Sequence, residues 1–447
     1  MSGYLTDSIG STGSRKTFTV SVWVKIDGNT VNQTMFGNGT GGSNSGKFYF
    51  AISNGQVRIG GGANVYIVTN RLFRDPASWY HLVCAVDTTQ ATAENRIKFY
   101  VNGVQETDFN TSTYPGQNDN TPTNDVGTIN TFGAEQGGGE SWDGYMTHMV
   151  MVDGTQLTPS NFGETDSTTG EWKPKAVPTG VTYGTNGAFL KCENSANFGV
   201  DSSGQGNNYT SNSFPTGAHT QDTASNTFAT FNSLANVLYA QGTLSEGNLK
   251  FLTTQTDYSY RPTTIGVDTG KWYWEIKAEA SGGGNDPFMI GITSTEPTAN
   301  SNELGHFAND WAFNEGAQYR NNNTNTSYGT TYTVGDIIGV ALDLDNNKLY
   351  FSKNGTWQNS GVPTSGATGT GAIAITAPGS TPLGNYFPAV GDYDNAAGSN
   401  STFQANFGNP PFSISSGNAD DAGYGTFEYD VPAGYYSLCS KNLNTYG

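Results

Sequence analysis

The chain has 447 residues, of which 13% are charged, and its formal net charge at pH 7 is -18. This length exceeds one typical domain, so we expect two or three folding units. The excess of negative charge disfavours contact with phosphate backbones and anionic lipids, which argues against nucleic-acid binding and against membrane insertion. Aromatic residues make up 13% of the chain, enough to build hydrophobic cores, so the chain is expected to fold.

Glycine is abundant, with 59 residues, and stretches rich in Asn, Ser and Thr separate the apolar runs. This composition is typical of many strands joined by tight turns. In the first half of the chain, alternation of apolar and polar residues predicts most strands, whereas residues 79–87 are apolar on both faces and predict an inner strand. The strands predicted there cover residues 17–26, 47–53, 57–59, 79–87, 96–101, 146–152 and 187–193.

Residues 211–234 are polar and carry no clear strand pattern, and we interpret them as a linker. This linker divides the chain into a first domain, residues 1–210, and a second domain, residues 235–447. Strands of the second domain are predicted over residues 271–278, 288–292, 337–344, 348–352, 386–391 and 402–407. Neither domain sustains the apolar stripe of a long amphipathic helix. The sequence therefore predicts an all-β fold of two antiparallel β-sandwiches.

Four segments of the first domain resemble a laminin-G or pentraxin-type domain of the concanavalin A-like class. They are FTVSVWVKID (18–27), WYHLVCAVDTT (79–89), RIKFYVNG (96–103) and WDGYMTHMVMVDG (142–154). The second domain is similar to SPRY domains, and the segments that carry this similarity are GKWYWEIKAE (270–279), FMIGI (288–292), YTVGDIIGVALDLDNNKLYFSKNGTW (332–357) and YFPAVG (386–391). The resemblance implies a concanavalin A-like jelly roll followed by a SPRY-type sandwich.

The segments 157–164, 170–175 and 183–209 together resemble an extension common in phage-encoded proteins of this type, and residues 432–443 resemble a terminus found in marine phage structural proteins. The extension is expected to return a strand to the sandwich and to end in a polar turn. The resemblance implies a virion component that is assembled in the host cytoplasm, with other virion proteins as partners. The N-terminal residues show no secretory signal pattern, and we expect none. Phage appendages are usually symmetric homo-oligomers, and a trimer is compatible with this chain, although no coiled-coil heptads specify one.

A polysaccharide depolymerase is the enzymatic alternative, because concanavalin A-like folds also host glycoside hydrolases. Such an enzyme needs two carboxyl groups across a cleft. No E-x-D-x-E run is present, and the nearest pattern, Asp343-Leu344-Asp345, precedes Asn346-Asn347 and is interpreted as ordering that turn. The four histidines lack zinc-binding spacing and no G-x-S-x-G motif occurs. No catalytic residue is assigned, and the chain is predicted not to be an enzyme.

Three loops rich in Asn and Asp, residues 118–120, 124–125 and 392–395, contain the oxygen ligands that Ca²⁺ prefers. Asn and Asp are also common turn formers, and no full ligand set can be assigned. The sequence therefore predicts neither a cofactor nor a definite metal site.

Sugar binding uses exposed aromatic rings that stack on the pyranose face, flanked by amide and carboxylate groups. The candidate ligand-binding rings are Trp311, Tyr319 and Trp357, which lie in stretches that look like loops and contain several Asn and Asp residues. The alternative is that these rings pack under the edges of the sandwich.

The sequence thus predicts a non-enzymatic virion protein, a fibre, tail or capsid-associated appendage, whose lectin-like domains adhere to host-surface or other glycans. One alternative is a purely structural capsid or tail decoration protein without a ligand, and another is the depolymerase. The missing carboxylate motif disfavours the depolymerase, but the sequence does not separate the first two classes.

Overall fold

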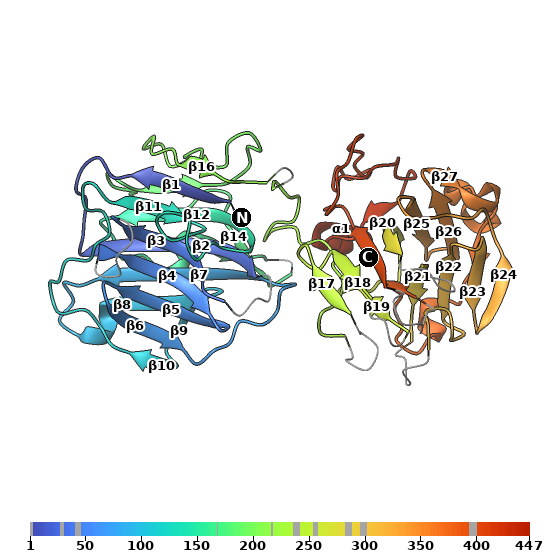
Figure 1. Cartoon of the computed structure of the whole chain (residues 1–447), viewed down its shortest axis with the longest axis horizontal. Helices are drawn as coiled ribbons and strands as arrows, with labels where there is room; N and C mark the ends of the chain where they lie inside the picture. Colours follow the sequence, from blue (N-terminus) through green and yellow to red (C-terminus); the bar gives the residue numbers. More distant parts are fainter. Residues whose placement is uncertain are drawn as a thin grey trace. The chain divides into compact units, whose positions relative to one another are not determined.

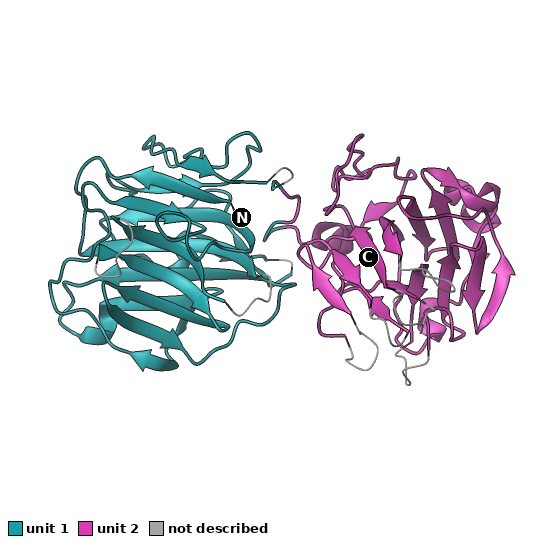
Figure 2. Cartoon of the chain, in the orientation of Figure 1, with its two compact units in different colours: residues 1–219, 223–225 teal, residues 220–222, 226–447 magenta. Residues whose placement is uncertain are grey.

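The computed structural model describes residues 3–26, 31–40, 46–167, 169–215, 218–235, 242–253, 258–281, 288–295, 302–392 and 400–447. The chain forms two compact units (Figure 2): unit 1 holds residues 1–219 and 223–225, and unit 2 holds residues 220–222 and 226–447. Both units are built mainly of antiparallel strands, which confirms the predicted all-β class. Among the described residues, no helix has the length and apolar character needed to cross a membrane.

Unit 1 is a sandwich of two sheets (Figure 1). The eight-stranded sheet has the order β10 (Phe109–Ser112), β6 (Asn64–Thr69), β5 (Gln56–Gly61), β4 (Phe48–Ser53), β3 (Gln33–Gly39), β11 (Ile129–Phe132), β1 (Tyr4–Ser8) and β16 (Thr210–Asn212). The six-stranded sheet has the order β15 (Ala188–Leu190), β12 (Gly144–Asp153), β2 (Thr17–Ile26), β7 (Trp79–Asp87), β8 (Ile97–Val101) and β9 (Val104–Glu106). The remaining elements are the hairpin of β13 (Gly163–Thr165) and β14 (Trp172–Pro174) and the 3-10 helices η2 (Ala93–Asn95) and η3 (Pro159–Asn161).

Strand β2 lies at the centre of the six-stranded sheet, between β7 and β12. Its apolar positions, Phe18 and Val20 among them, fill the core between the two sheets. Its polar positions are buried as well, because residues 157–183 lie over the outer face of this sheet, where Phe162 packs on β7 and β12. We call residues 157–183 the unit 1 covering segment, and it forms a third layer of the fold.

The chain that follows this segment returns to the sandwich. Strand β15 pairs with β12, and the carboxylate of Asp201 then accepts hydrogen bonds from four backbone N–H groups. The donors are those of Phe189, Ser203, Gly206 and Asn207. This confirms the expected return strand and polar turn, since one carboxylate satisfies the donors of a whole loop.

Unit 2 also contains two sheets (Figure 1). The nine-stranded sheet has the order β17 (Thr243–Ser245), β18 (Lys250–Leu252), β30 (Ser401–Asn406), β20 (Lys271–Ser281), β25 (Ile337–Asp343), β26 (Lys348–Lys353) and β27 (Thr356–Trp357), with β28 (Ile373–Ala374) on β26 and β31 (Tyr436–Ser437) on β20. The six-stranded sheet has the order β19 (Tyr260–Pro262), β29 (Phe387–Gly391), β21 (Met289–Thr293), β22 (Asp310–Asn314), β23 (Gln318–Asn321) and β24 (Thr324–Ser327). The helices are η4 (Gln358–Ser360), η5 (Pro363–Thr368), η6 (Pro378–Ser380) and α1 (Ser440–Tyr446).

Strand β20 organises unit 2. Its inward-facing side chains include Trp272, Trp274 and Ile276, as the period-two pattern predicts. On the opposite face of the sheet, Tyr273 packs against Phe427 and Tyr435, which belong to the chain after the last long strand. We call residues 427–435 the unit 2 covering segment, because it shields the outer face of the nine-stranded sheet.

Much of the expected linker, residues 211–234, is packed onto the two units in the structure. Strand β16 extends to Asn212 and pairs with β1, while Ala224 packs with Trp23 and Trp79. Phe228 and Phe231 are buried in unit 2. A polar stretch with isolated aromatic residues therefore carries packing contacts that its composition does not reveal.

Candidate functional site

Trp311 does not lie on an exposed loop, contrary to the sequence-based expectation. It is the second residue of β22 and faces the core of unit 2, where 4% of its surface is exposed and its ring packs edge-on against Tyr386 at 5.7 Å. Because alternate residues of a strand face opposite sides, the neighbouring Asp310 and Ala312 point away from the core. Both ring faces of Trp311 are therefore unavailable to a sugar.

The polar residues near Trp311 are also committed to the fold. Asn314 is buried, and Asn321 Nδ2 donates to the carbonyl oxygens of Ala308 and Asp310 at 3.0 and 2.7 Å. Asn323 accepts a hydrogen bond from Arg320. The sugar site expected around Trp311 is thus not assembled, because its hydrogen-bonding groups tie β23 to the chain at the start of β22 and close the turn between β23 and β24.

Tyr319 and Trp357, the other two candidate rings, are half-buried. Tyr319 packs edge-on against Tyr328 at 6.0 Å between ring centroids. Trp357 packs edge-on against Tyr273 at 6.4 Å and Tyr350 at 6.5 Å. Both rings keep a partly exposed surface, and Trp357 lies in β27, the second strand of the hairpin that begins at β26.

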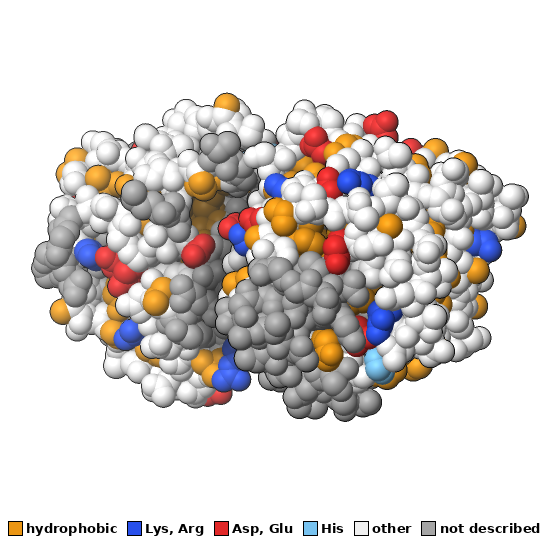
Figure 3. Space-filling view, turned by 45° about the vertical axis from the view of Figure 1, so that its right-hand side comes forward, with side chains coloured by type: hydrophobic (Ala, Val, Ile, Leu, Met, Phe, Trp, Pro, Cys, Tyr) orange, Lys and Arg blue, Asp and Glu red, His pale blue; other side chains and the backbone are white. Residues whose placement is uncertain are grey.

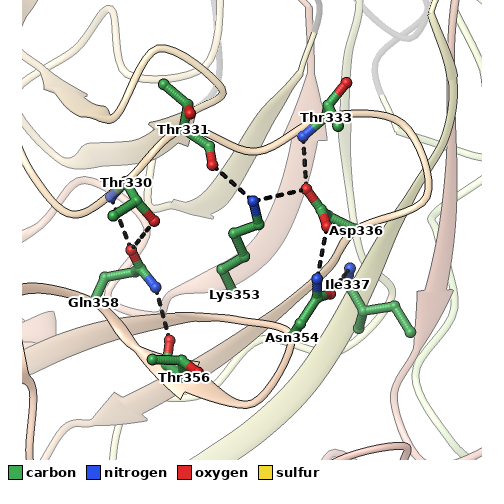
Figure 4. A network of polar contacts seen from close by, with 9 residues as sticks. All are labelled: Thr330, Thr331, Thr333, Asp336, Ile337, Lys353, Asn354, Thr356 and Gln358. Atoms are coloured by element: carbon green, nitrogen blue, oxygen red, sulfur yellow. Dashed lines mark hydrogen bonds and ion pairs between the residues drawn. The ribbon is translucent and has the colours of Figure 1, made fainter.

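A network of polar contacts holds the loop before β25 against this hairpin (Figure 4). Lys353 Nζ donates to the carbonyl oxygen of Thr331 at 2.9 Å and pairs with Asp336 Oδ2 at 3.1 Å. The other oxygen of Asp336 accepts from Asn354 Nδ2 at 2.6 Å, and Asn354 Oδ1 accepts from the backbone N–H of Ile337 at 2.8 Å. Burial raises the pKa of Asp336, but its hydrogen bonds and Lys353 outweigh burial, so that its pKa lies below the ordinary value.

Gln358 forms the second half of the network (Figure 4). Its Oε1 accepts from both the backbone N–H and the hydroxyl of Thr330, each at 2.8 Å, and its Nε2 donates to the carbonyl oxygen of Thr356 at 2.7 Å. Gln358 is buried, whereas Thr330 and Thr356 are exposed. The network therefore fixes the Thr330 hydroxyl and the backbone of Thr356 on the two sides of a buried amide.

We call Thr330, Thr356, Trp357 and Asn359 the Trp357 surface. It combines a partly exposed ring with hydroxyl and amide groups on a backbone that the network holds in place. A surface fixed in advance loses less conformational entropy when a ligand binds. The sequence indicated Trp357, but it did not indicate Thr330 or Gln358, and the Asn354-Gly355 hairpin was the available signal.

In unit 1, Ser21 Oγ lies 2.8 Å from His81 Nε2, an arrangement that resembles a nucleophile and its base. The indole N–H of Trp172 donates to His81 Nδ1 at 3.0 Å, so Nδ1 carries the lone pair and Nε2 carries the hydrogen. His81 therefore donates to Ser21, whereas a catalytic base would accept its proton. Burial, with a smaller effect of His148, lowers the pKa of His81 to about 3. The group is a buried structural contact.

The carboxylates singled out from the sequence hold turns. Asp343 accepts from the backbone N–H and the amide of Asn346 and pairs with Lys271, which supports its interpretation as a turn-ordering residue. In the proposed calcium loops, Asp125 pairs with Arg15 at 2.8 Å. Asn118, Asp119, Asn120 and Asn124 lie in loops of unit 1, and residues 393–395 lie outside the described part of the chain. Across the described ranges, no group of three His, Cys, Asp or Glu residues could hold a metal ion.

Charge is sparse on the surface. On the face drawn in Figure 3, charged side chains are scattered among a larger area of uncharged polar side chains and backbone. Such a surface suits ligands that offer hydroxyl and amide groups better than it suits phosphates.

Comparison with known proteins identifies both units. Residues 2–161 match the family model of the concanavalin A-like lectin/glucanases superfamily, and residues 271–409 match that of the SPRY domain. Ran-binding protein 9 of Danio rerio is 33% identical over 89 residues, which are 19% of this chain and 14% of that protein. Ran-binding protein 9 of Xenopus laevis is 31% identical over 122 residues, 25% of this chain and 22% of that protein. The chain thus spans less than a quarter of these relatives.

Similar solved structures include the SPRY domain of human HERC1, which is 15% identical and covers 37% of this chain and 91% of its own, with a TM-score of 0.28. Stonustoxin is 21% identical and covers 40% of this chain and 27% of its own, also with a TM-score of 0.28.

Proposed function

Because the chain carries a concanavalin A-like domain followed by a SPRY domain, both binding-type modules, we propose that it is a non-enzymatic adhesion protein of a bacteriophage particle. In this proposal it forms part of a fibre, a tail or a capsid-associated appendage and binds host-surface or other glycans. The Trp357 surface is the observation that carries the adhesion role.

The chemistry of the Trp357 surface fits a saccharide. A sugar ring offers an apolar face to an aromatic ring and hydroxyl groups to polar side chains. Trp357 supplies the ring, Thr330 supplies a hydroxyl group that Gln358 holds in place, and Thr356 supplies a second hydroxyl on a backbone that Gln358 contacts. The His81–Ser21 contact cannot activate a nucleophile, which supports a binding role over hydrolysis.

The assignment to a phage particle has a separate basis. It rests on the tandem of the two domains and on the resemblance of residues 157–164, 170–175, 183–209 and 432–443 to segments of phage structural proteins, which is an argument by analogy. Partners would be other virion proteins, and a homo-oligomer such as a trimer is the assembly proposed here.

A second candidate function is structural decoration of the particle without a ligand. Strand β24 favours it, because it is the terminal strand of its sheet and all four of its residues are exposed. A terminal strand can pair with a strand of another chain.

The adhesion role is tested by a glycan array probed with the whole chain and with Trp357→Ala. We expect binding to at least one glycan and a loss of at least tenfold in the variant, while Leu252→Ala, at an exposed residue of β18, binds as the wild type. Binding to no glycan would contradict the adhesion role and leave decoration. If the chain shortens a polysaccharide that it binds, the proposal that it is not an enzyme is wrong. If mass spectrometry does not find the chain in purified phage particles, the virion assignment is wrong.

A further inference from the structure

Unit 1 contains a cavity of about 250 Å³ at one edge of its sandwich. Strand β9 ends the six-stranded sheet there, β10 ends the eight-stranded sheet, and residues 107–108 connect the two (Figure 1). Residues of β8, β9 and β10 line the cavity. The cavity thus opens where the two sheets are joined only by this short connection and the side chains beside it.

The cavity has an apolar base and aromatic walls. Ile97 and Phe99 of β8 are buried and form part of the sandwich core. Phe109 and Tyr114 are half-buried and also line the cavity. A ligand that enters can place an apolar face against these rings and displace water from the base.

The rim is polar and uncharged over much of its length. Gln105, Thr107 and Ser112 are exposed and contribute one amide and two hydroxyl groups to the lining. In the described part of the chain, none of these three side chains makes a hydrogen bond to another residue. Their donors and acceptors are available to a ligand that carries several hydroxyl groups.

The charges around the cavity balance. Glu106 pairs with Arg71 at 2.6 Å, and the lining contains one further anion, Glu94, and one further cation, Lys98. Burial, followed by the negative charge of Glu94, raises the pKa of Tyr114, so its hydroxyl stays protonated and can donate. A charged ligand would lose hydration on entering the cavity, and a lining with equal positive and negative charge would not attract it. An uncharged ligand does not have this desolvation cost.

We infer that this edge cavity is a second binding site and that it takes a single uncharged saccharide ring. Small-molecule sites usually span about 300–1,000 Å³, so this smaller cavity suits one ring rather than an oligosaccharide. Two aromatic walls and a hydroxyl-rich rim match the apolar face and the equatorial hydroxyl groups of a pyranose. The inference rests on the proposed glycan adhesion, to which it adds a site in unit 1 and a ligand class.

Saturation-transfer NMR on the whole chain tests this site, with the methyl glycosides of glucose, galactose, mannose and N-acetylglucosamine as probes and glucuronic acid as the charged comparison. We expect at least one neutral glycoside to bind. Tyr114→Ala removes a wall, and Ser112→Trp fills the mouth from an exposed position of β10, so each is expected to weaken binding at least tenfold. Asn110→Trp, also exposed on β10 but outside the lining, is the matched control and should bind as the wild type.

The outcomes separate the cavity from the Trp357 surface. Three results would overturn the inference. A neutral glycoside could bind equally well to the wild type, to Tyr114→Ala and to Ser112→Trp. The wild type could prefer glucuronic acid, or it could bind no neutral glycoside. If the cavity variants keep all array binding and Trp357→Ala loses it, the edge site fails and the adhesion role stands. If no variant and no wild-type sample binds any glycan, both fail. An unchanged unfolding midpoint in Ser112→Trp shows that the result reports on the cavity and not on folding.

Discussion

Each unit covers the outer face of one sheet with a chain segment, and the two units hold that segment in different ways. In unit 1, the covering segment, residues 157–183, is held by the Trp172 N–H on the neutral His81. It is also held at its two ends, where the Leu157 N–H donates to the Thr19 hydroxyl and the Tyr183 carbonyl accepts from the Asp153 N–H. In unit 2, the covering segment, residues 427–435, is held by the carboxylate of Glu275. The comparison shows that a segment can be held over the outer face of a sheet either by a buried neutral side chain or by a buried carboxyl group.

The two anchors differ in how many donors they engage. Glu275 accepts from the backbone N–H groups of Glu428 and Tyr429 at 3.0 and 2.8 Å, from the Tyr273 hydroxyl at 3.1 Å and from Asn406 Nδ2 at 3.0 Å. Burial raises its pKa, and these hydrogen bonds offset part of that rise. Glu275 binds the covering segment through its backbone N–H groups, and hydrogen bonds to a charged carboxylate are stronger than those to a neutral group. We therefore expect Glu275 to hold its segment more strongly than His81 holds the segment of unit 1.

The largest effect is expected from Glu275→Ala. It leaves the backbone donors of Glu428 and Tyr429 without their acceptor, at about 1–3 kcal/mol each, so the free energy of unfolding of unit 2 should fall by about 3 kcal/mol or more. Urea unfolding measures the loss. Glu279→Ala is the control on the same strand, because its partly exposed ion pair with Lys250 should contribute at most about 1 kcal/mol. Equal losses in the two variants would contradict the anchoring role.

Acidification is expected to destabilise unit 1 through His81. Its pKa is about 3 in the folded unit against 6.5 in the unfolded chain, so its contribution is complete above pH 6.5 and is lost as the pH falls toward 3. At about 1.4 kcal/mol per pH unit, unfolding becomes about 2 kcal/mol easier between pH 7 and pH 5. Hydrogen exchange of β7 peptides measures this slope. His81→Phe should reduce it, and an unchanged slope would show that other groups cause it.

Unit 2 should respond to pH in the opposite direction at Asp310. Burial raises the pKa of this fully buried carboxyl to about 7 from 3.8, although Thr293 donates to it at 2.8 Å. Its contribution to stability is therefore complete below pH 3.8 and is lost as the pH rises to about 7, and between pH 5 and pH 7 the loss is about 2 kcal/mol. Asp310→Asn should flatten the dependence measured by exchange of β22 peptides. A variant with the wild-type dependence would contradict this assignment.

The smallest effect is expected from Trp172→Phe. The ring still fills the space over β7, but the donor to His81 Nδ1 is gone, and one lost hydrogen bond contributes about 1 kcal/mol to stability. Urea unfolding at pH 7 measures the difference. A loss as large as that of Glu275→Ala would mean that the two anchors are equally strong.

The main strands could be predicted from the sequence, and some coincide with the structure residue by residue. Residues 17–26 and 79–87 were each predicted as a strand, and they are β2 and β7. Short polar strands such as β10 and β24 were missed. Their residues are exposed or half-buried at sheet edges, so no clear apolar alternation marks them.

The burial of Trp311 could not be predicted from the sequence pattern. Trp311 lies beside Asn309, Asp310 and Asn314, so its surroundings resemble a loop. In the structure, Asp310 and Asn314 are buried on the opposite face of β22. The strand is placed there by its pairing with β21 and β23, which the local sequence does not reveal. Polar residues beside an aromatic residue in the sequence therefore do not show that its ring is exposed, because a strand that is covered on both faces buries polar residues too.

By itself the sequence determined the all-β class and the central strands, because the two-residue period of a buried strand is a local property of the chain. The tertiary structure alone decided which aromatic rings stay accessible and where a ligand can enter. Phe109 and Tyr114 reach the edge cavity because β10 pairs with β6 while β9 pairs with β8 in the other sheet. The β8–β9 hairpin follows from the local Asn102-Gly103 turn, but the β10–β6 pairing joins residues that are distant in the sequence, and no local pattern encodes it.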